Sequence, residues 1–357
     1  MSAYSYQAPQ RVPRSLGHGL GIIIIAFGNE DVLRALITRL LAEKRDNDYI
    51  VLIDNHPAHG CAQIAESIPG VDAVIRSKNI GFAAGCNRAA KEFPSHIDLI
   101  LLLNPDVVPA PLAITKLRVG AQADWSAWMG LLTLPDNTVN SAGTIVHMSG
   151  LSWCGQYGES QDSLTHNTQV NFLSGACLMI KRQVWEDMGG FCEGYFMYYE
   201  DTDLCLRMRQ QGLKLGLVVS ARFEHDYTFS KSPQKWFYLE RNRYEFMWRL
   251  WPASVITVMM PYLFVCEVGL WVVSLLQGRL LLRLRSITNL TRQIPVILIE
   301  RRLLQPRSTL TGVQFLDLLQ PAIDTPLLGS FLTARVLNTS FRAYHRVVRV
   351  VLSKLSG

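Results

Sequence analysis

The sequence lacks the patterns on which several protein classes depend. Its seven cysteines are scattered, without a C-x-x-C pair or a Cys/His quartet at zinc spacing, which argues against a zinc module and is typical of a reducing cytoplasm. Charged residues make up only 18% of the chain and hydrophobic residues 49%, which excludes wholesale disorder and a coiled coil. No glycine fingerprint follows the first apolar run, which argues against a nicotinamide or flavin dehydrogenase.

The chain also has no internal repeat and no low-complexity tract. Its 357 residues are enough for one large domain with an appendage or for two ordinary domains. Residues 1–20 contain no apolar core of the kind that a signal peptide has, so we expect a loose lead-in there.

The charge is distributed unevenly. Residues 277–357 hold 12 of the 35 basic residues and 3 of the 29 acidic residues, which leaves 23 basic and 26 acidic residues before them. A strongly basic tail requires an anionic partner, either nucleic acid or an anionic membrane surface. We expect the membrane and no nucleic acid, because the basic residues stand among aliphatic residues and few aromatic residues are present to stack on bases.

Residues 21–103 alternate short apolar runs with helical patterns. The runs 22–27, 49–53, 71–75 and 98–103 predict strands, with one helix between the first two and another that ends near Pro69. Such an alternation predicts a parallel sheet covered on both faces. Ligands of these sheets bind beyond the carboxyl ends of the strands, so residues 26–29, 54–55 and 104–106 are the first candidates for a site.

The alternation is lost between about residues 110 and 170, where turn signals predict loops and short antiparallel strands. A further strand is predicted over 172–180, and a helix over 201–211 that Gly212 ends.

Residues 253–276 form an apolar stretch long enough to cross a membrane, interrupted by Pro261, Glu267 and Gly269. A glutamate in the middle of a spanning helix is costly unless it is paired. We therefore favour a segment that lies in the membrane interface or enters it as a helical hairpin, flanked by the arginines of 279–285. The alternatives are a spanning helix and a helical subdomain buried against the main domain.

Two acidic features are candidates for chemistry. Asp106 directly follows a buried run and could bind Mg²⁺ or Mn²⁺ together with phosphate oxygens; the alternative is an ordinary turn residue. Glu200, Asp201 and Asp203 follow the bulky residues 195–199, an environment that raises the pKa of a carboxyl group toward values suited to a general base. A helix N-terminus would account for Asp203 alone.

Two further signals are weaker when taken alone. His225 lies near the end of the domain and could be a metal ligand, although a lone histidine is more often structural. Residues 79–87 form a glycine-punctuated loop that leads into a helix.

These blocks are specific in combination. In chain order they are residues 22–30, V-L-I-D-N at 51–55, N-I-G-F-A-A-G-C-N at 79–87, L-L-N-P-D at 102–106, F-L-S-G-A-C-L-M-I-K-R at 172–182, the 189–207 block with E-D-T-D, and His225. The series resembles the family 2 glycosyltransferases, and within them the bacterial rhamnosyltransferase-type branch. The resemblance covers about residues 20–250, and the block 172–207 is its most specific part.

The resemblance implies a GT-A fold, an α/β nucleotide-binding domain over residues 21–235, followed by a helical, basic, membrane-associating region over 236–357. Asn104 stands where the family's D-x-D metal motif has its first aspartate, so one carboxylate rather than two faces the metal. The implied roles are nucleotide binding by Asp54, Asn79, Gly81, Phe82, Asn87 and Asn104, metal binding by Asp106 and His225, general base catalysis by Asp201 with Glu200 as the alternative, and acceptor binding by Ser174, Gly175 and Asp203.

The implied activity is inverting transfer of a sugar from a nucleotide-activated donor, with Mg²⁺ or Mn²⁺ as cofactor. The expected donor is dTDP-rhamnose, and the expected acceptor is a polyprenyl-diphosphate-linked or polysaccharide glycan of the cell envelope. We expect a peripheral or monotopic protein at the cytoplasmic face of the inner membrane. The open alternatives are UDP-N-acetylglucosamine, UDP-galactose, UDP-galactofuranose or GDP-mannose as donor, and a non-catalytic sugar-nucleotide-binding scaffold subunit.

Overall fold

The computed structural model describes residues 18–28, 30–56, 58, 60–225, 233–325 and 335–355, so most of the predicted lead-in and Asn29 lie outside the described residues. Four parallel strands form the first half of the main sheet: β1 (Gly19–Ala26), β2 (Tyr49–Asp54), β3 (Ala73–Arg76) and β4 (Ile97–Leu103). The helices between them are α1 (Glu30–Glu43), α2 (Cys61–Glu66) and α3 (Phe82–Ala90). The predicted α/β alternation is therefore confirmed.

The register of the central strands brings their carboxyl ends to one edge. Ala26 of β1 pairs with Asp54 of β2, and Ile24 of β1 pairs with Leu103 of β4. Aliphatic side chains in β1, β2 and β4 are buried on both faces, as expected of strands covered by helices on two sides. The short loops that follow these strands contain the first site candidates.

The second half of the sheet is mixed. The strands are β5 (Val107–Pro109), β6 (Ala127–Thr133), β7 (Val139–Ser141), β10 (Thr168–Val170), β11 (Cys177–Lys181) and β12 (Leu215–His225), and the sheet order is β10-β12-β6-β11-β4-β1-β2-β3, with β5 on β12 and β7 on β6. β11 is antiparallel to both β4 and β6. A separate hairpin pairs β8 (Thr144–Val146) with β9 (Ser152–Cys154).

Short helices complete this half. They are α4 (Ala113–Leu117), α5 (Arg182–Met188) and α6 (Glu200–Gln210), with 3₁₀ turns at Arg118–Gln122, Gln161–Ser163 and Glu193–Tyr195. The strand predicted over 172–180 begins only at Cys177, because residues 174–176 form a turn in which the Ser174 carbonyl accepts from the Cys177 amide. The helix predicted to end near Pro69 ends at Glu66.

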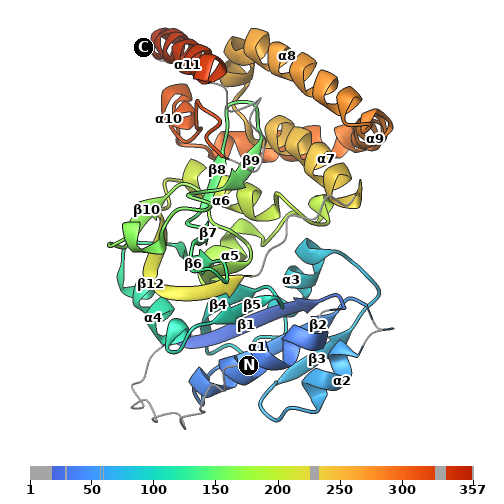
Figure 1. Ribbon diagram of the computed structural model, residues 1–357, viewed down its shortest axis with the longest axis vertical. Coiled ribbons are helices and arrows are strands. Elements are labelled where there is room, and N and C mark those ends of the chain that lie inside the picture. The colour runs from blue at the N-terminus through green and yellow to red at the C-terminus, as the bar shows by residue number, and fades with distance from the viewer. Residues whose placement is uncertain are drawn as a thin grey trace.

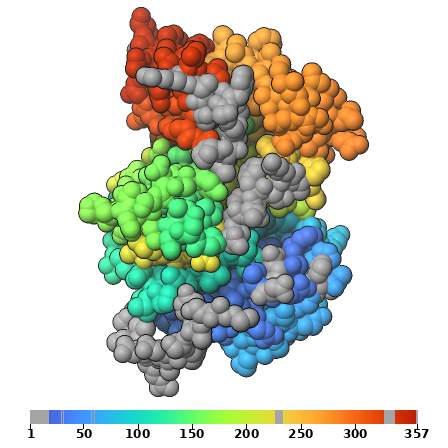
Figure 2. Space-filling model, in the orientation of Figure 1, coloured from blue at the N-terminus to red at the C-terminus, as the bar shows by residue number. Residues whose placement is uncertain are grey.

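The C-terminal region is helical: α7 (Pro233–Leu250), α8 (Ala253–Leu276), α9 (Leu280–Leu304), α10 (Gly312–Leu316) and α11 (Arg335–Leu355), with a 3₁₀ turn at Gln305–Arg307. Figure 1 shows α8 to α11 gathered at the end of the molecule opposite β1, β2 and β3. In the space-filling view α8 and α11 form the surface at that end (Figure 2). This arrangement confirms a helical C-terminal region.

Helix α7 contacts both the α/β domain and the C-terminal helices. Its polar side chains at positions 241, 242, 243, 245 and 249 are buried; Arg241 and Asn242 bond to the loop that precedes α6, and Arg243 and Arg249 pair with Glu267 of α8 and Glu300 of α9. We therefore propose a catalytic unit that extends to Leu250, instead of the boundary between 235 and 236.

Candidate active site

Strand pairing places Asp106 beside His225. Asp106 lies between β4 and β5, and Val107 at the start of β5 pairs with His225 at the end of β12. The Nε2 atom of His225 lies 3.6 Å from Oδ1 of Asp106. The structure thus brings together the two residues that the resemblance assigns to the metal.

The surroundings of this pair fit a divalent cation. Asp106 Oδ1 is buried and has no hydrogen-bond partner among the residues that the structure describes. Nδ1 of His225 lies 3.1 Å from Oδ1 of Asn140, which orients the imidazole, and the tautomer with its proton on Nδ1 would offer Nε2 as an electron-pair donor. Two ligands that each lie about 2.1 Å from one Mg²⁺ are separated by roughly 3 Å or more, which matches the observed spacing.

Two protein ligands alone are too few to bind a divalent cation tightly. Within the described parts of the chain, no group of three or more His, Cys, Asp or Glu side chains is arranged to bind a metal. Mg²⁺ commonly has few protein ligands and takes the remainder from phosphate oxygens and water. The geometry therefore fits a cation that binds together with a nucleoside diphosphate.

Asp201 is fixed by backbone donors at the start of α6. Its Oδ2 accepts from the Gly175 amide at 2.7 Å, and its Oδ1 accepts from the Thr202 amide at 2.6 Å and from the Thr202 hydroxyl at 3.2 Å. Burial raises the pKa of Asp201, and these hydrogen bonds only partly oppose it. The side chain is half-buried, so it is oriented and still reachable, as a general base must be.

Glu200 is more deeply enclosed than Asp201. Its Oε2 is buried with no hydrogen-bond partner among the described residues, and only 5% of the residue is exposed. Burial, together with the charge of Asp201, raises the pKa of Glu200 well above its ordinary value. The environment favours a protonated carboxyl group, which supports Asp201 rather than Glu200 as the base.

Asp203 has a structural position and not the acceptor-binding one expected from the sequence. The side chain is fully buried, and its carboxylate is bound by Arg207, Arg249 and the hydroxyl of Tyr195. Burial acts to raise the pKa of Asp203, but the two guanidinium charges outweigh it and lower the pKa. With its oxygens enclosed in this way, Asp203 does not face an acceptor.

Ser174 and Gly175 lie next to Asp201, as their assignment requires. Gly175 leaves little space: a Cβ atom added there would lie 3.3 Å from Oδ2 of Asp201. The turn is tied to the β4 end, because the Asn104 amide donates to the carbonyl of Ala176. Ser174, Asn104 and Asp201 are therefore neighbours at one edge of the sheet.

The expected nucleotide-binding residues take different positions. Asp54 is fully buried, and its two oxygens accept from the amides of His56 and Ala62, so in this structure it orients the loop after β2 and does not face a ligand.

Asn79 accepts from the Gly81 amide in a local turn. Gly81 has a φ of 86°, and a Cβ there would meet Phe196. Phe82 begins α3, and its amide donates to the Phe196 carbonyl at 2.7 Å.

Asn87 connects two segments of the chain. Its amide group donates to the Phe191 carbonyl and to Glu193, and its Oδ1 accepts from the Phe191 amide. The side chain joins α3 to the loop that follows α5, and its role in nucleotide binding stays a prediction.

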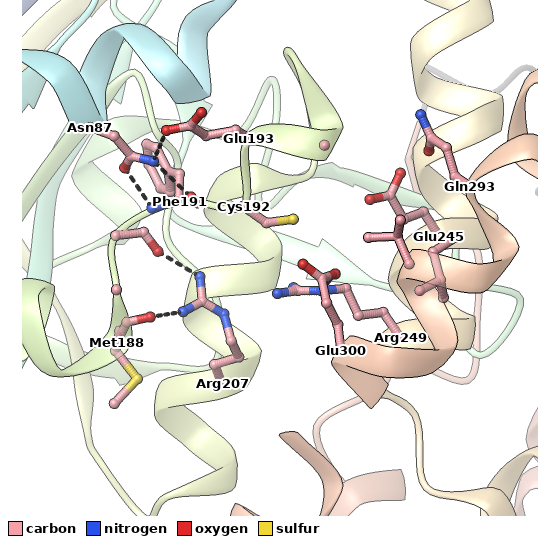
Figure 3. Close-up of a pocket in the computed structure, with 15 residues that line it drawn as sticks. Asn87, Met188, Phe191, Cys192, Glu193, Arg207, Glu245, Arg249, Gln293 and Glu300 are labelled. Atoms are coloured by element: carbon pink, nitrogen blue, oxygen red, sulfur yellow. Dashed lines mark hydrogen bonds and ion pairs between the residues drawn. The ribbon is translucent and has the colours of Figure 1, made fainter. Parts of the chain in front are cut away.

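Asn87 also lines a cavity of about 540 Å³ that lies apart from the Asp106–His225 pair. Figure 3 shows Asn87 and Phe191 on one wall and Glu245 and Gln293, from α7 and α9, on the other. Neither Asp106 nor Asp201 lines this cavity. The cavity is therefore separate from the candidate active site.

Lys235 was not predicted from the sequence to lie near the carboxylates of the site, and Tyr198 was noted only as one of the bulky residues 195–199. The Lys235 ammonium lies 5.6 Å from the centre of the Tyr198 ring, and burial lowers the pKa of Lys235 to about 8. Burial and the charges of Glu200 and Asp106 raise the pKa of Tyr198, so this side chain lies near both carboxylates. No motif marks Lys235; its place in the site depends on the path of α7.

The chain is similar to known glycosyltransferases. The family described as "Glycosyltransferase like family 2" matches residues 18–244. The rhamnosyltransferase WbbL of Escherichia coli strain K12 is 27% identical over 215 residues, covering 55% of this chain and 79% of that protein. The N-acetylglucosaminyl-diphospho-decaprenol L-rhamnosyltransferase of Mycobacterium tuberculosis strain H37Rv is 29% identical over 202 residues, covering 49% and 66%.

The fold also matches a solved structure. GalNAc-T7, crystallised with UDP, GalNAc and Mn²⁺, superposes with a TM-score of 0.54 at 16% identity, covering 67% of this chain and 50% of that one. At this identity the likeness establishes the fold alone. The predicted α/β fold of GT-A type is confirmed.

Proposed function

The chain belongs to the glycosyltransferase-like family 2 and is similar to its rhamnosyltransferases, and from this premise we propose that it is an inverting, metal-dependent transferase of a nucleotide-activated sugar. The observation that carries the proposal is the position of three side chains at one edge of the sheet. Asp106 and His225 form a pair that fits a cation, and Asp201 lies beside Gly175 as an oriented carboxylate.

In the proposed reaction, a hydroxyl oxygen of the acceptor attacks the anomeric carbon of the donor sugar. The bond between that carbon and the diphosphate oxygen breaks, and its electron pair leaves with the nucleoside diphosphate. Asp201 takes the hydroxyl proton, for which its raised pKa suits it. A divalent cation held by Asp106 and His225 would neutralise charge that develops on the diphosphate. Lys235 adds a positive charge to the same region.

We propose dTDP-rhamnose as the donor and a polyprenyl-diphosphate-linked or polysaccharide glycan as the acceptor, in synthesis of a cell-envelope polysaccharide. The support is the similarity to two rhamnosyltransferases, one of which is described as acting on a decaprenol-linked substrate. The carboxylate of Asp106, together with phosphate oxygens and water, suits both Mg²⁺ and Mn²⁺.

We further propose that the C-terminal helices bind the cytoplasmic surface of the inner membrane. Among the described helices, α8 alone is long and apolar enough to cross a membrane by length and composition, which by itself is weak evidence. One face of α8 is exposed and apolar, and further exposed apolar side chains lie on α9 and α11. On α8 these exposed residues are Met260, Phe264, Val265, Val268, Val272, Leu275 and Leu276.

The ion pairs of Glu267, near the middle of α8, favour an orientation in which α8 lies flat on the membrane. Glu267 accepts from Arg243 of α7 at 2.6 Å and from Arg283 of α9 at 2.5 Å. A helix held to its neighbours in this way keeps its midpoint at the protein surface and presents one face to lipid. Arginines on α9 and α11 supply the positive charge that attracts anionic lipid.

Thermal unfolding of the purified chain with dTDP, UDP and GDP, each with and without Mn²⁺, tests the donor assignment. A ligand that binds only the folded state raises the unfolding temperature. The proposal expects the largest rise with dTDP and Mn²⁺ together. A larger rise with UDP or GDP would replace the donor sugar and keep the mechanism, whereas no rise with any nucleotide would contradict transfer from a nucleotide-activated sugar.

A further inference from the structure

The loop that leads into the Glu200–Asp201 pair has an unfavourable backbone conformation. Phe196, Tyr198 and Tyr199 have φ values of 65°, 68° and 73°, in the left-handed region that bulky residues rarely adopt. Such conformations persist only where the surrounding structure enforces them. The loop must therefore be held by contacts outside itself.

Those contacts come mainly from one turn of α7. The side-chain amide of Asn242 donates to the carbonyls of Tyr195, Met197 and Tyr198, at 3.1, 2.8 and 2.7 Å. The Arg241 guanidinium donates to the carbonyls of Gly194 and Tyr195, both at 2.7 Å. Asn242 is fully buried, so water cannot replace its amide.

The remaining loop carbonyls are also bound. The Phe196 carbonyl accepts from the amides of Phe82 and Ala83, at the start of α3. The Tyr199 carbonyl accepts from the Asp203 amide within α6. Every carbonyl from residue 194 to 199 therefore has a donor, and two of the six, those of Met197 and Tyr198, have Asn242 as their donor.

Asn242 is itself held in one orientation. Its Oδ1 accepts from Nε of Arg241 at 2.7 Å, which fixes the amide nitrogen toward the loop. The ring of Phe196 stacks on Tyr238 of the same helix, with the centroids 5.1 Å apart and the planes 14° apart. Helix α7 thus sets both the backbone and one aromatic side chain of this loop.

We propose that Asn242 is a positioning residue for the transfer reaction. It holds the loop 195–199, in which Phe196, Tyr198 and Tyr199 have positive φ, and this places the Asp201 carboxylate against Gly175 and the acceptor. This inference rests on the proposed function, because it assigns Asp201 as the base. Asn242 touches no substrate and acts only through the loop.

The test compares Asn242→Asp with Asn338→Asp. Asn338 on α11 is a matched control, since it is also buried and its side-chain amide also donates to a backbone carbonyl, that of Ile323, at 2.8 Å. Asn242→Asp keeps the size of the side chain and the acceptor for Arg241 but sets an oxygen against the carbonyls. Asn242→Ser is a smaller change for use if the first variant does not fold.

The first readout is hydrogen–deuterium exchange of the full chain, which needs no substrate. The proposal expects faster exchange in peptides that cover residues 195–203 in the Asn242 variants and no change there in Asn338→Asp. Unchanged exchange in this segment would overturn the proposal, whatever the enzyme's substrate.

The second readout separates kcat from KM, using dTDP-rhamnose with Mn²⁺ and a synthetic N-acetylglucosaminyl-diphospho-polyprenol. We expect kcat to fall about 100-fold in the Asn242 variants while the KM for the donor changes less than about threefold, because misplacement of a reacting group by about 1 Å has an effect of this order. If kcat of the Asn242 variants is no lower than kcat of Asn338→Asp, Asn242 is not a positioning residue. If the wild type itself transfers nothing, the assigned substrates are wrong and the exchange result decides the role of Asn242.

Discussion

Nε2 of His225 lies 3.6 Å from Oδ1 of Asp106, although the two residues come from distant parts of the chain. The pairing of β5 with β12 creates this relationship, because it aligns His225 with Val107, the residue that follows Asp106. Asn140 on β7 orients the imidazole from behind. The site therefore depends on three strands that meet in the antiparallel half of the sheet.

Replacement of His225 by alanine is expected to weaken Mn²⁺-dependent binding of a nucleoside diphosphate. Removal of one of two protein ligands should lower the affinity by about tenfold or more, since even the partners that only orient a ligand contribute about that much. Isothermal titration with dTDP, with and without Mn²⁺, measures the effect. His166→Ala, at an exposed position outside the site, is the control. Equal dTDP affinity in the wild type and His225→Ala in the presence of Mn²⁺ would exclude His225 as a ligand.

The pH dependence of kcat should report Asp201. Burial raises the pKa of this carboxyl group, and only its deprotonated form can accept the proton, so kcat should fall as the pH decreases through that raised pKa. The hydroxyl of Thr202 opposes the shift through its hydrogen bond to Oδ1. Thr202→Val removes this bond and is expected to move the acid limb to higher pH. An acid limb that stays in place would point to a different base.

Arg249 is expected to contribute strongly to folding stability. It forms an ion pair with the fully buried Asp203, whose other guanidinium partner is Arg207. Arg249→Met leaves a buried carboxylate with incomplete compensation, so the free energy of unfolding should fall by about 3 kcal/mol. Urea titration followed by circular dichroism measures it. The exposed pair Lys214–Asp124 supplies the control, and Lys214→Met should change little. A similar small change for Arg249→Met would show that the buried pair is not required.

His147 should make stability depend on pH. It is fully buried, and burial lowers its pKa from an ordinary 6.5 to about 3, so the unfolded chain binds a proton that the folded chain rejects. Stability should therefore decrease as the pH falls from 6.5 toward 3, by about 1.4 kcal/mol per pH unit for this one group. Compared with the wild type, His147→Asn should lose this part of the slope in urea titrations at pH 7, 6 and 5. The same slope in both proteins would refute the assignment, and the exposed His166→Asn should leave it intact.

The parallel half of the fold was predictable from the sequence because apolar runs such as 22–27 and 98–103 have the length and composition of buried strands. The carboxyl-edge rule then predicted, from the sequence, that Asp106 lies at the edge of the sheet where ligands bind. The antiparallel half was less predictable, since β5, β7 and β10 are three residues long and their pairing depends on partners far away in the chain.

The roles of individual acidic residues depended on burial, which periodicity does not reveal. Asp54 and Asp203 stand in conspicuous motifs, and yet backbone amides or guanidinium groups enclose their oxygens. Lys235 and Asn242 carry no motif signal, because their positions follow from the packing of α7 against the loop before α6. Such packing is set by tertiary contacts rather than by local pattern.

The central claim is that this chain transfers a sugar with Asp201 as the base. Its most direct test is a transfer assay with dTDP-rhamnose, Mn²⁺ and N-acetylglucosaminyl-diphospho-polyprenol, comparing the wild type with Asp201→Asn after both have been shown to bind dTDP equally. We predict product from the wild type and a loss of kcat of about 10³-fold in Asp201→Asn, which keeps the shape of the side chain and removes its basicity. Undiminished transfer by Asp201→Asn would contradict the assigned base, and absence of transfer by the wild type with dTDP-, UDP- and GDP-sugars alike would contradict the enzymatic function itself.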